Sequence, residues 1–480
     1  MDLIDLLSIS PVGFLVLWAL LVLLIDLWLP RRFKGVTPLF ASLGLAIDLG
    51  LNISLSALQV SGFSGMMRLD GFAVFLNLIF LGSGLVGVAL AYDYLKRMNA
   101  VRGEYYALIL FSVCGMMLMA QADDLILVFL ALELLSIPLY VLAGFLRGNL
   151  LSQEAALKYF LLGAFASGFL LYGIAMVYGA TSYTNLTSIA QLVNGAHYPG
   201  LLLLGAGFIL VGFGFKVAAS PFNLWVPDVY QGAPTPVTGF MSVAVKAAGF
   251  AGLMRVFILA FPSLSSDLTP LLWGLAALTM LVGNLVALLQ TNMKRMLAYS
   301  SIAHAGYLLM GFVSFGNGAV VGSAVSAMLF YLLGYGLTSF AAWAVVIALE
   351  QVDGKGVSLS DYKGLGKRQP LLALTMAAAM LSFTGIPITV GFWGKLFLFR
   401  SALEGGFIGL VLVGLAAAVV SAYYYLRVIA MMYMHTGEPE VRRDGWLNLT
   451  ALVSALAVVG LGFIPYIILQ AVSTAVIQLP

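Results

Sequence analysis

The feature of this sequence that most constrains its fold is a series of long apolar runs separated by short polar connections. A helical run of about 20 apolar residues spans the hydrocarbon core of a membrane. These runs do not alternate polar with apolar residues, and backbone groups in lipid must be hydrogen-bonded internally, so helices are predicted rather than a β-barrel. The expected fold is an all-α polytopic membrane protein with about fourteen spans, near residues 11–29, 36–57, 70–92, 105–122, 124–146, 156–179, 201–226, 236–260, 269–290, 297–315, 319–349, 371–398, 406–433 and 447–475.

Composition excludes several classes of function. Residues are 62% hydrophobic and 9% charged, and the net charge of +3 is too small for the basic surface that binds nucleic acid. The single cysteine, Cys114, permits no internal disulfide, cysteine-rich zinc site or iron–sulfur cluster. Of the three histidines, His197 and His435 fall in polar connections, which leaves no pair of haem ligands. We therefore expect neither a metal nor a redox cofactor in this chain.

The basic residues predict an orientation, because loops on the inner side of a membrane carry an excess of Lys and Arg. With the N-terminus outside, sixteen basic residues fall in inner loops and only Arg68 and Arg400 in outer ones. An even number of spans then places both termini on the outer side. The sixteen are Arg31, Arg32, Lys34, Lys96, Arg97, Arg102, Arg147, Lys158, Lys294, Arg295, Lys355, Lys363, Lys367, Arg368, Arg442 and Arg443.

Seven charged residues lie within the apolar runs themselves: Lys216, Lys246, Arg255, Lys395, Arg427, Glu133 and Asp48. Each costs about 2.5–3.5 kcal/mol at the centre of a span, so each must pair, lose its charge or face water. Burial favours a neutral lysine and a nearby carboxylate favours a charged one, so buried Lys and Glu together can exchange protons. Simple packing ion pairs are the alternative, and we favour that alternative for Arg427 and for Asp26 near the inner boundary. For Asp48 both interpretations stay open.

Two prolines predict broken helices next to lysines. Pro221 follows Lys216 in the seventh run, and Pro387 precedes Lys395 in the twelfth. Proline removes a helical hydrogen bond, and irregular backbone at membrane depth is tolerated only where protein or water satisfies it. Runs seven and twelve cross in opposite directions, as in the inverted repeats of secondary transporters, although simple kinks remain the alternative. The predicted organisation is three N-terminal helices (1–100), two five-helix repeats (101–262 and 263–435) and a C-terminal helix (436–480).

Two long segments resemble a known family. Residues 221–238 read PFNLWVPDVYQGAPTPVT and are followed by Lys246, and residues 284–307 read NLVALLQTNMKRMLAYSSIAHAGY. Both are similar to the antiporter-like membrane subunits of proton-pumping NADH:quinone oxidoreductase, respiratory complex I. The resemblance is greatest to the N subunits and covers nearly the whole chain. The M subunits typically have glutamate at the position of Lys395, and the L subunits continue into a long lateral helix.

The resemblance implies roles for five residues. Glu133 and Lys216 would form the charge pair of a first half-channel, and Lys246 would relay protons toward the centre. His304 would be a link in the second half, and Lys395 its terminal proton site. The family often has histidine where this chain has Asn223, so a role for histidine at that point does not carry over.

The resemblance also implies a setting. The chain would be a translocase subunit of the bacterial plasma (inner) membrane, with both termini on the periplasmic side. Quinone, NADH, FMN and iron–sulfur clusters would bind to partner subunits, and M-, K-, J- and L-like membrane subunits would be its neighbours in the lipid bilayer. Two other functions stay open: a subunit of an Mrp-type cation/proton antiporter or related complex, and a scaffold that moves no protons.

Overall fold

A computed structural model describes residues 2–193, 200–442, 444–475 and 477, and it describes the side chains of these residues except Arg31 and Arg32. His197 and Arg443 lie outside the described residues. Twelve helical segments in the described part are long and apolar enough to cross a membrane. They are α1 (Leu3–Trp28), α2 (Thr37–Ser54, preceded by a 3-10 turn), α3 (Gly71–Arg97), α4 (Gly103–Gln121), α5 (Leu125–Ala143), α6 (Leu150–Thr181), α8 (Gly200–Val217), α10 to α11 (Thr235–Ala260), α12 (Ser265–Leu288), α14 (Val321–Leu349), α18 (Ile408–Met434) and α19 (Gly445–Phe463).

The two remaining predicted runs are also helical. One is α13 (Met293–Phe312), and the other consists of two short helices, α16 (Pro370–Thr384) and α17 (Val390–Glu404). Shorter elements connect the long ones: strands β1 (Val60–Gly62) and β2 (Met67–Leu69), α7 (Leu186–Val193), α9 (Trp225–Gly232), α15 (Leu365–Arg368) and α20 (Pro465–Thr474). The strands form one antiparallel hairpin with Val60 opposite Leu69. The prediction of an all-α polytopic membrane protein is confirmed.

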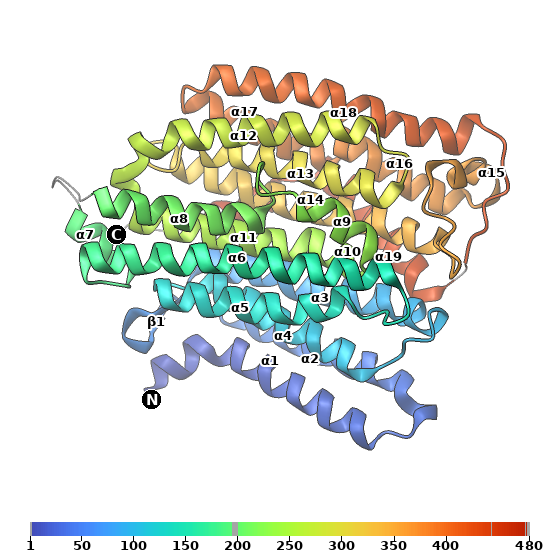
Figure 1. The fold of residues 1–480 in the computed structure, drawn as a ribbon, viewed down its shortest axis with the longest axis horizontal. Coiled ribbons are helices and arrows are strands. Elements are labelled where there is room, and N and C mark those ends of the chain that lie inside the picture. Colours follow the sequence, from blue (N-terminus) through green and yellow to red (C-terminus); the bar gives the residue numbers. More distant parts are fainter. Residues whose placement is uncertain (1, 194–199, 443, 476, 478–480) are drawn as a thin grey trace.

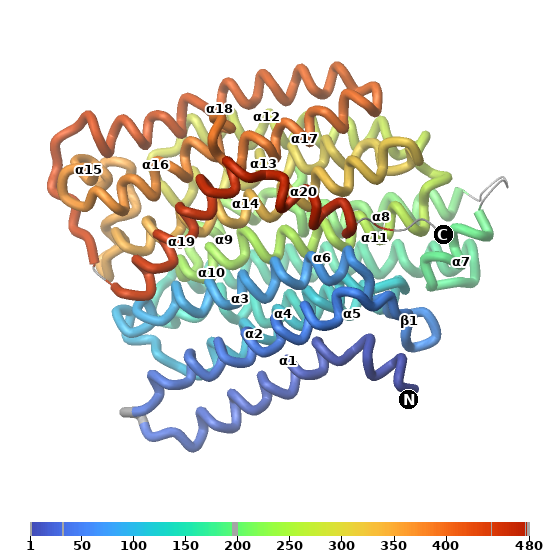
Figure 2. Tube along the Cα trace, turned by 180° about the vertical axis from the view of Figure 1, so that it is seen from behind, coloured from blue at the N-terminus to red at the C-terminus, as the bar shows by residue number. Residues whose placement is uncertain are grey.

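The long helices lie roughly side by side in one bundle, with α1 at one edge and α18 at the opposite edge (Figures 1 and 2). The segment from α10 to α11 is buried throughout and α14 nearly so, whereas α1, α6, α18 and α19 each bury well under half of their residues. These outer helices expose large apolar side chains such as Leu24, Phe165, Leu412 and Leu456. Such an apolar surface is suited to contact with lipid hydrocarbon rather than with water.

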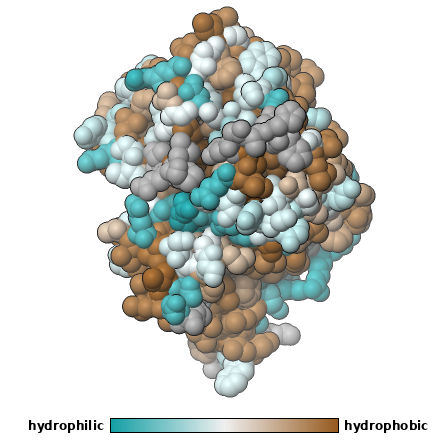
Figure 3. Space-filling model, turned by 90° about the vertical axis from the view of Figure 1, so that its left-hand side faces the viewer, coloured by the Kyte–Doolittle hydropathy of each residue, from teal (hydrophilic) through white to brown (hydrophobic). Residues whose placement is uncertain are grey.

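The first turn of α1 and the last turn of α20 lie at the same end of the bundle. The backbone N–H of Phe63, just after β1, donates to Asp5 in α1. The carbonyl of Thr474 in α20 lies 2.7 Å from the position a Cβ would take on Gly71, where α3 begins. Seen from this end, hydrophilic residues lie among hydrophobic ones in the centre, and hydrophobic residues dominate the lower edge (Figure 3). Because α1 begins and α20 ends on the same side of the bundle, the chain crosses the membrane an even number of times.

Both proline-containing runs are broken, as predicted. α8 ends at Val217, and the next residue, Ala218, has a left-handed backbone (φ +64°) before α9 begins. α16 ends at Thr384, and α17 begins five residues beyond Gly385, after Ile388 with φ +80°. The breaks therefore extend beyond the prolines themselves, and each opens a stretch of non-helical backbone within the bundle.

The charges for which packing was favoured do have partners. Asp26 accepts hydrogen bonds from Lys34 and Thr37, each at 2.8 Å. Arg427 donates to the carbonyls of Leu288 and Gln290 near the end of α12. By contrast, Asp48 is fully buried in α2, and neither carboxylate oxygen has a hydrogen-bond partner among the described residues.

Arg255, the most deeply buried of the basic residues, is also paired. It is 0% exposed, and its guanidinium donates to both carboxylate oxygens of Asp70 at 2.6 and 2.9 Å. It also donates to the carbonyl of Ala120 at the end of α4. This cation therefore joins α11 to the start of α3 and the end of α4.

Candidate functional site

Lys216 lies one residue before the end of α8, where the seventh run is broken. It is 4% exposed, and its Nζ has no hydrogen-bond partner among the described residues. Two tyrosine rings lie beside it, with centroids 5.3 Å (Tyr159) and 5.7 Å (Tyr140) from Nζ. A cation within about 6 Å of an aromatic face is stabilised by about 2 kcal/mol when water is absent. The tyrosine rings can therefore stabilise the charged ammonium group of Lys216 although they carry no full negative charge.

Glu133 lies in the middle of α5, and its Oε1 is buried without a hydrogen-bond partner among the described residues. No nitrogen–oxygen contact within 4.0 Å joins it to Lys216, although the two charges act on each other electrostatically. Tyr140 follows Glu133 by seven residues, which places both on one face of α5. Tyr140 thus stands beside both charged groups, and Glu133 and Lys216 are near each other rather than in direct contact.

Lys246 is the first residue of α11 and directly follows a π-helical turn, Met241–Val245. It is 3% exposed, and its Nζ donates to both the carbonyl oxygen and the Oγ of Ser301 in α13. The hydroxyl of Tyr335 donates to the same Oγ at 2.9 Å. π-helical turns inside α-helices frequently occur at functional sites. The turn places Lys246 against a serine that is itself part of a hydroxyl chain.

Lys216 and Lys246 lie on helices in direct contact. Gly249, three residues after Lys246, packs against Lys216, and a Cβ on this glycine would lie 3.4 Å from the Lys216 Cβ. The close approach of α8 and α11 at this level depends on the missing side chain.

His304 lies three residues after Ser301 on α13 and is 3% exposed. Its Nδ1 is 2.5 Å from the hydroxyl of Tyr331, and its Nε2 is 3.1 Å from the hydroxyl of Tyr425. A hydroxyl can donate or accept, and the two imidazole nitrogens can exchange roles. A proton can therefore enter at one nitrogen of His304 and leave from the other.

Lys395 lies in α17, just after the second break, and is 6% exposed. Its Nζ donates to the carbonyls of Phe383 and Thr384 at 2.7 and 3.0 Å. These carbonyls end α16, and the C-terminus of a helix carries a partial negative charge of about half an electron. The Tyr307 ring centroid is 4.9 Å from Nζ. The helix end, rather than a carboxylate, compensates the ammonium.

A small cavity of about 10 Å³ adjoins this second half of the site. It is lined by His304, Tyr331, Thr338 and Ser382, among others. A volume of about 10–15 Å³ is what one water molecule needs, provided that polar partners surround it. The cavity thus lies where a single water can connect α13 with the break between α16 and α17.

The five predicted residues follow one another across the bundle. α5 lies toward one edge, α11 and α13 in the middle, and α17 toward the other edge (Figures 1 and 2). Sequence reasoning did not identify the hydroxyls of Ser301, Tyr331, Tyr335 and Tyr425. A usable signal existed for two of them: Tyr331 and Tyr335 are four residues apart, which places them on one helical face, and a buried tyrosine hydroxyl usually finds a partner.

Asn223 lies within the first break, is 5% exposed, and accepts a hydrogen bond from the Ser220 hydroxyl at 2.8 Å. The residue that replaces the family's usual histidine therefore makes a contact local to the break.

Comparison with known proteins assigns the site to a family. Residues 122–421, which contain all five predicted residues and both breaks, match the family described as NADH:quinone oxidoreductase/Mrp antiporter, TM. An NADH-quinone oxidoreductase subunit N from Trichlorobacter lovleyi is 46% identical over 98% of this chain and 97% of its own length.

Solved structures agree with this match. A chain of respiratory complex I from Thermus thermophilus with bound aureothin has a TM-score of 0.83 and 38% identity, covering 97% of this chain and 99% of that one. A chain of the Mrp complex from Dietzia sp. has a TM-score of 0.86 at 22% identity, covering 99% of this chain and 97% of that one, which shows a shared fold.

Proposed function

The chain belongs to the family of NADH:quinone oxidoreductase and Mrp antiporter membrane subunits, and we propose that it is the N-type, proton-translocating membrane subunit of an NADH:quinone oxidoreductase. One observation carries the mechanism: Lys216, Lys246 and Lys395 are each at least 94% buried, and none forms a salt bridge within the described part of the chain. In a low-dielectric interior, an ammonium group without a carboxylate in direct contact is much closer in energy to the neutral amine than an exposed ammonium group is. Each lysine can therefore release and regain a proton.

The proposed route joins these groups in their order across the bundle. A proton on Lys216 is held by the Tyr140 and Tyr159 rings and by the charge of Glu133. Transfer to Lys246 crosses the contact between α8 and α11. Beyond Lys246, the Ser301 hydroxyl is bonded to Tyr335, whose ring centroid is 5.1 Å from that of His304. On the far side of His304, the Tyr331 hydroxyl and the small cavity lie toward α17, which carries Lys395. Quinone reduction in partner subunits supplies the free energy.

We also propose the repeat organisation, with 101–262 and 263–435 as inverted five-helix units. The support is one broken, lysine-bearing run in each unit, α8–α9 and α16–α17. The lysines differ in position, since Lys216 precedes its break and Lys395 follows its break. A rotation that superposes the two units with opposite membrane directions supports this organisation; failure to superpose contradicts it.

The proposed setting is the bacterial plasma membrane, with both chain ends outside and M-, K-, J- and L-like subunits as neighbours. NADH, FMN, iron–sulfur clusters and quinone are proposed for partner subunits. In the described residues, no group of three or more His, Cys, Asp or Glu side chains is placed to hold a metal ion. Co-purification discriminates this setting from the Mrp-type alternative: partners with flavin and iron–sulfur absorbance support complex I, and partners without that absorbance support an antiporter.

The relay is tested by replacing Lys216 and Lys395 with arginine. Arginine keeps the positive charge but does not release its proton in proteins. We expect Lys216→Arg and Lys395→Arg to assemble, yet to lower proton pumping at least about tenfold, because a general proton carrier contributes about 10²–10⁴-fold. Pumping is measured in reconstituted vesicles and normalised to assembled complex.

The matched control is Lys158→Arg, because Lys158 is 40% exposed and already paired with Glu154 and Asp228. This variant should pump normally. Near-normal pumping by both Lys216→Arg and Lys395→Arg would show that these lysines supply charge alone. That result would contradict the proposed proton relay.

A further inference from the structure

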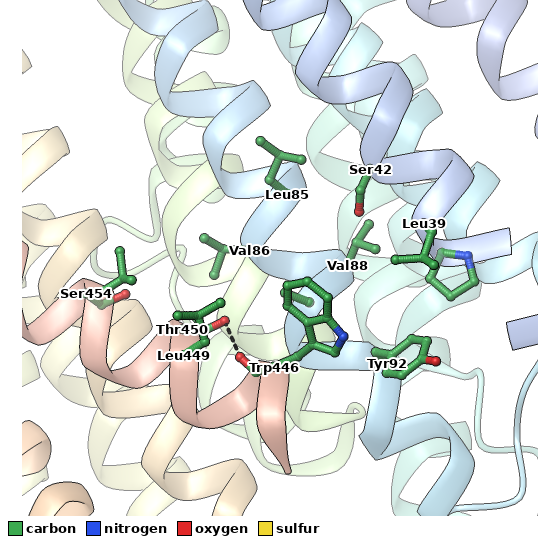
Figure 4. Close-up of a pocket in the computed structure, with 13 residues that line it drawn as sticks. Leu39, Ser42, Leu85, Val86, Val88, Tyr92, Trp446, Leu449, Thr450 and Ser454 are labelled. Carbon is green, nitrogen blue, oxygen red and sulfur yellow. Dashed lines mark hydrogen bonds between the residues drawn. The ribbon is translucent and has the colours of Figure 1, made fainter. Parts of the chain in front are cut away.

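An apolar groove opens on the outside of the bundle between α2 and α19, with α3 as its floor. Leu39 and Ser42 come from α2, Val86 and Val88 from α3, and Thr450 from α19, and Figure 4 shows the α3 side chains between those of the other two helices. The Thr450 hydroxyl is already bonded to the carbonyl of Trp446 in its own helix. The groove therefore presents almost only hydrocarbon, and none of the proton-transfer residues lines it.

The groove is elongated and apolar. Its volume is about 320 Å³. The α19 residues that line it, from Trp446 to Ser454, span about 12 Å of helix. Along this length the three helices offer a hydrocarbon chain continuous apolar contact.

One end of the groove has the features of the lipid head-group level. Trp446 and Tyr92 lie there, and Trp446 is 45% exposed. Tryptophan and tyrosine concentrate at the membrane–water interface, because they combine an apolar ring with a polar group. Lys96 lies one turn beyond Tyr92, with its Nζ 3.6 Å from the centroid of the Tyr92 ring and its side chain 47% exposed. A cation is thus held at the mouth of an apolar groove.

Two carboxylates accompany this cation. Asp93 lies 3.7 Å from Lys96, and Asp444, which precedes α19, acts on Asp93 electrostatically as a like charge. Within the described residues Asp444 forms no salt bridge of its own. Arg97 also acts on Asp93 electrostatically, so two carboxylates and two cations lie at this level and both signs of charge are present. A ligand that complements this mouth needs a phosphate for Lys96 and a cation for Asp93 and Asp444.

We propose that this groove binds one aminophospholipid, with an acyl chain between α2 and α19 and a primary ammonium head group at Asp93 and Asp444. A primary ammonium carries three N–H donors and can bond to both carboxylates, whereas the quaternary ammonium of a choline lipid has none. An anionic glycerol lipid would place its charge beside two carboxylates. Phosphatidylethanolamine therefore fits better than phosphatidylcholine or phosphatidylglycerol. The inference does not depend on the proposed proton transfer.

The test counts lipids on the purified, assembled complex by native mass spectrometry. Delipidated complex is incubated with equal amounts of dioleoyl phosphatidylethanolamine, phosphatidylcholine and phosphatidylglycerol. Ala89→Phe fills the groove from α3 and should remove one bound phosphatidylethanolamine per copy of this chain. Ala416→Phe adds the same bulk to an exposed position on α18, at the far edge of the bundle, and should leave the count unchanged.

A second variant tests the head group without touching the packing. Asp444→Asn should lower the preference for phosphatidylethanolamine over phosphatidylcholine about tenfold, the order expected for one lost hydrogen bond between charged groups. This measurement stands even if Ala89→Phe does not assemble. Equal retention of the three lipids by the unmodified complex, an unchanged preference in Asp444→Asn, or a lipid count that Ala89→Phe leaves intact would each overturn the proposal.

Discussion

At the scale of single residues, the three buried lysines are stabilised in three different ways. Lys216 lies beside aromatic faces, Lys246 donates to a serine, and Lys395 donates to the carbonyls that end α16. None of these partners is a full negative charge. A carboxylate in direct contact would hold the proton tightly, because an attraction across 4 Å is worth about 4 kcal/mol at an effective dielectric near 20. Weaker partners keep both protonation states accessible.

The hydroxyls around His304 give a residue-scale prediction. Tyr425→Phe removes the partner of His304 Nε2 and of the Ser300 hydroxyl. We expect proton pumping per assembled complex to fall several-fold, while stability decreases by about 1 kcal/mol, the worth of a buried hydrogen bond.

Its neighbour supplies the control. Tyr424 is equally buried, and its hydroxyl donates to Asn284 at 3.0 Å rather than to His304. The Tyr424 hydroxyl also interacts with that of Tyr425 but does not contact His304. Tyr424→Phe should therefore lose similar stability and keep more of its pumping rate than Tyr425→Phe. Equal pumping by the two variants would mean that the Tyr425 hydroxyl only supports packing.

At the scale of elements, the two broken runs share a backbone feature. Each contains one non-glycine residue with a left-handed backbone, Ala218 in the first break and Ile388 in the second. This conformation costs roughly 1–2 kcal/mol for a residue with a Cβ and is unusual for a β-branched side chain. α19 packs directly on the second break: a Cβ on Gly462 would lie 2.2 Å from the Ile388 carbonyl oxygen. Strained backbone that persists must be held by its surroundings.

Ile388→Gly should therefore stabilise the purified complex by about 1 kcal/mol, because the relief of the left-handed strain exceeds the entropy that glycine loses on folding. Ile386 lies two residues away and is also exposed, but its φ is not positive. Ile386→Gly should destabilise by about 0.5–1 kcal/mol. Thermal inactivation midpoints of the two variants measure the difference, and a shift in the same direction for both contradicts this account of the strain.

At the scale of the whole molecule, one ion pair joins the N-terminal helices to the core. Arg255 in α11 and Asp70 at the start of α3 are 185 residues apart in sequence. Removing one partner of a buried pair leaves the other charge uncompensated, at a cost of about 3–5 kcal/mol. Arg255→Met should therefore reduce assembly of the complex, measured as the yield of this chain in purified complex.

Removing both partners of the ion pair tests whether the uncompensated charge causes the loss of assembly. Asp70→Asn with Arg255→Met removes both charges of this pair, while Asp123 keeps its ion pair with Arg68, and should recover part of the yield. A double variant that assembles worse than Arg255→Met alone would show that the carboxylate has another role.

Membrane orientation is the other prediction at this scale. Cys114 is fully buried, so cysteines introduced elsewhere can be labelled against a quiet background. An impermeant thiol reagent added outside intact cells should label Arg400→Cys and should not label Lys363→Cys. The reverse pattern would invert the proposed topology.

The sequence predicted more of the fold than of the candidate site. The spans and the positions of the buried lysines within them depend on local sequence, because lipid requires an internally bonded helix of about 20 residues. The fourteen helical runs follow from this requirement. Proline indicates where a helix can break, but Pro138 lies inside the continuous helix α5 and Pro270 inside α12. Proline by itself therefore does not determine that the runs of Lys216 and Lys395 are the broken ones.

Only the tertiary structure decided what each charge contacts. Lipid and protein interior are equally apolar, so hydropathy does not reveal which face of a transmembrane helix meets another helix. The contact of Lys246 with Ser301, the hydroxyls on both nitrogens of His304 and the helix end at Lys395 arise from such faces. The π-helical turn before Lys246 likewise has no marker in its five residues, because it is set by the packing of a segment that is buried on every side.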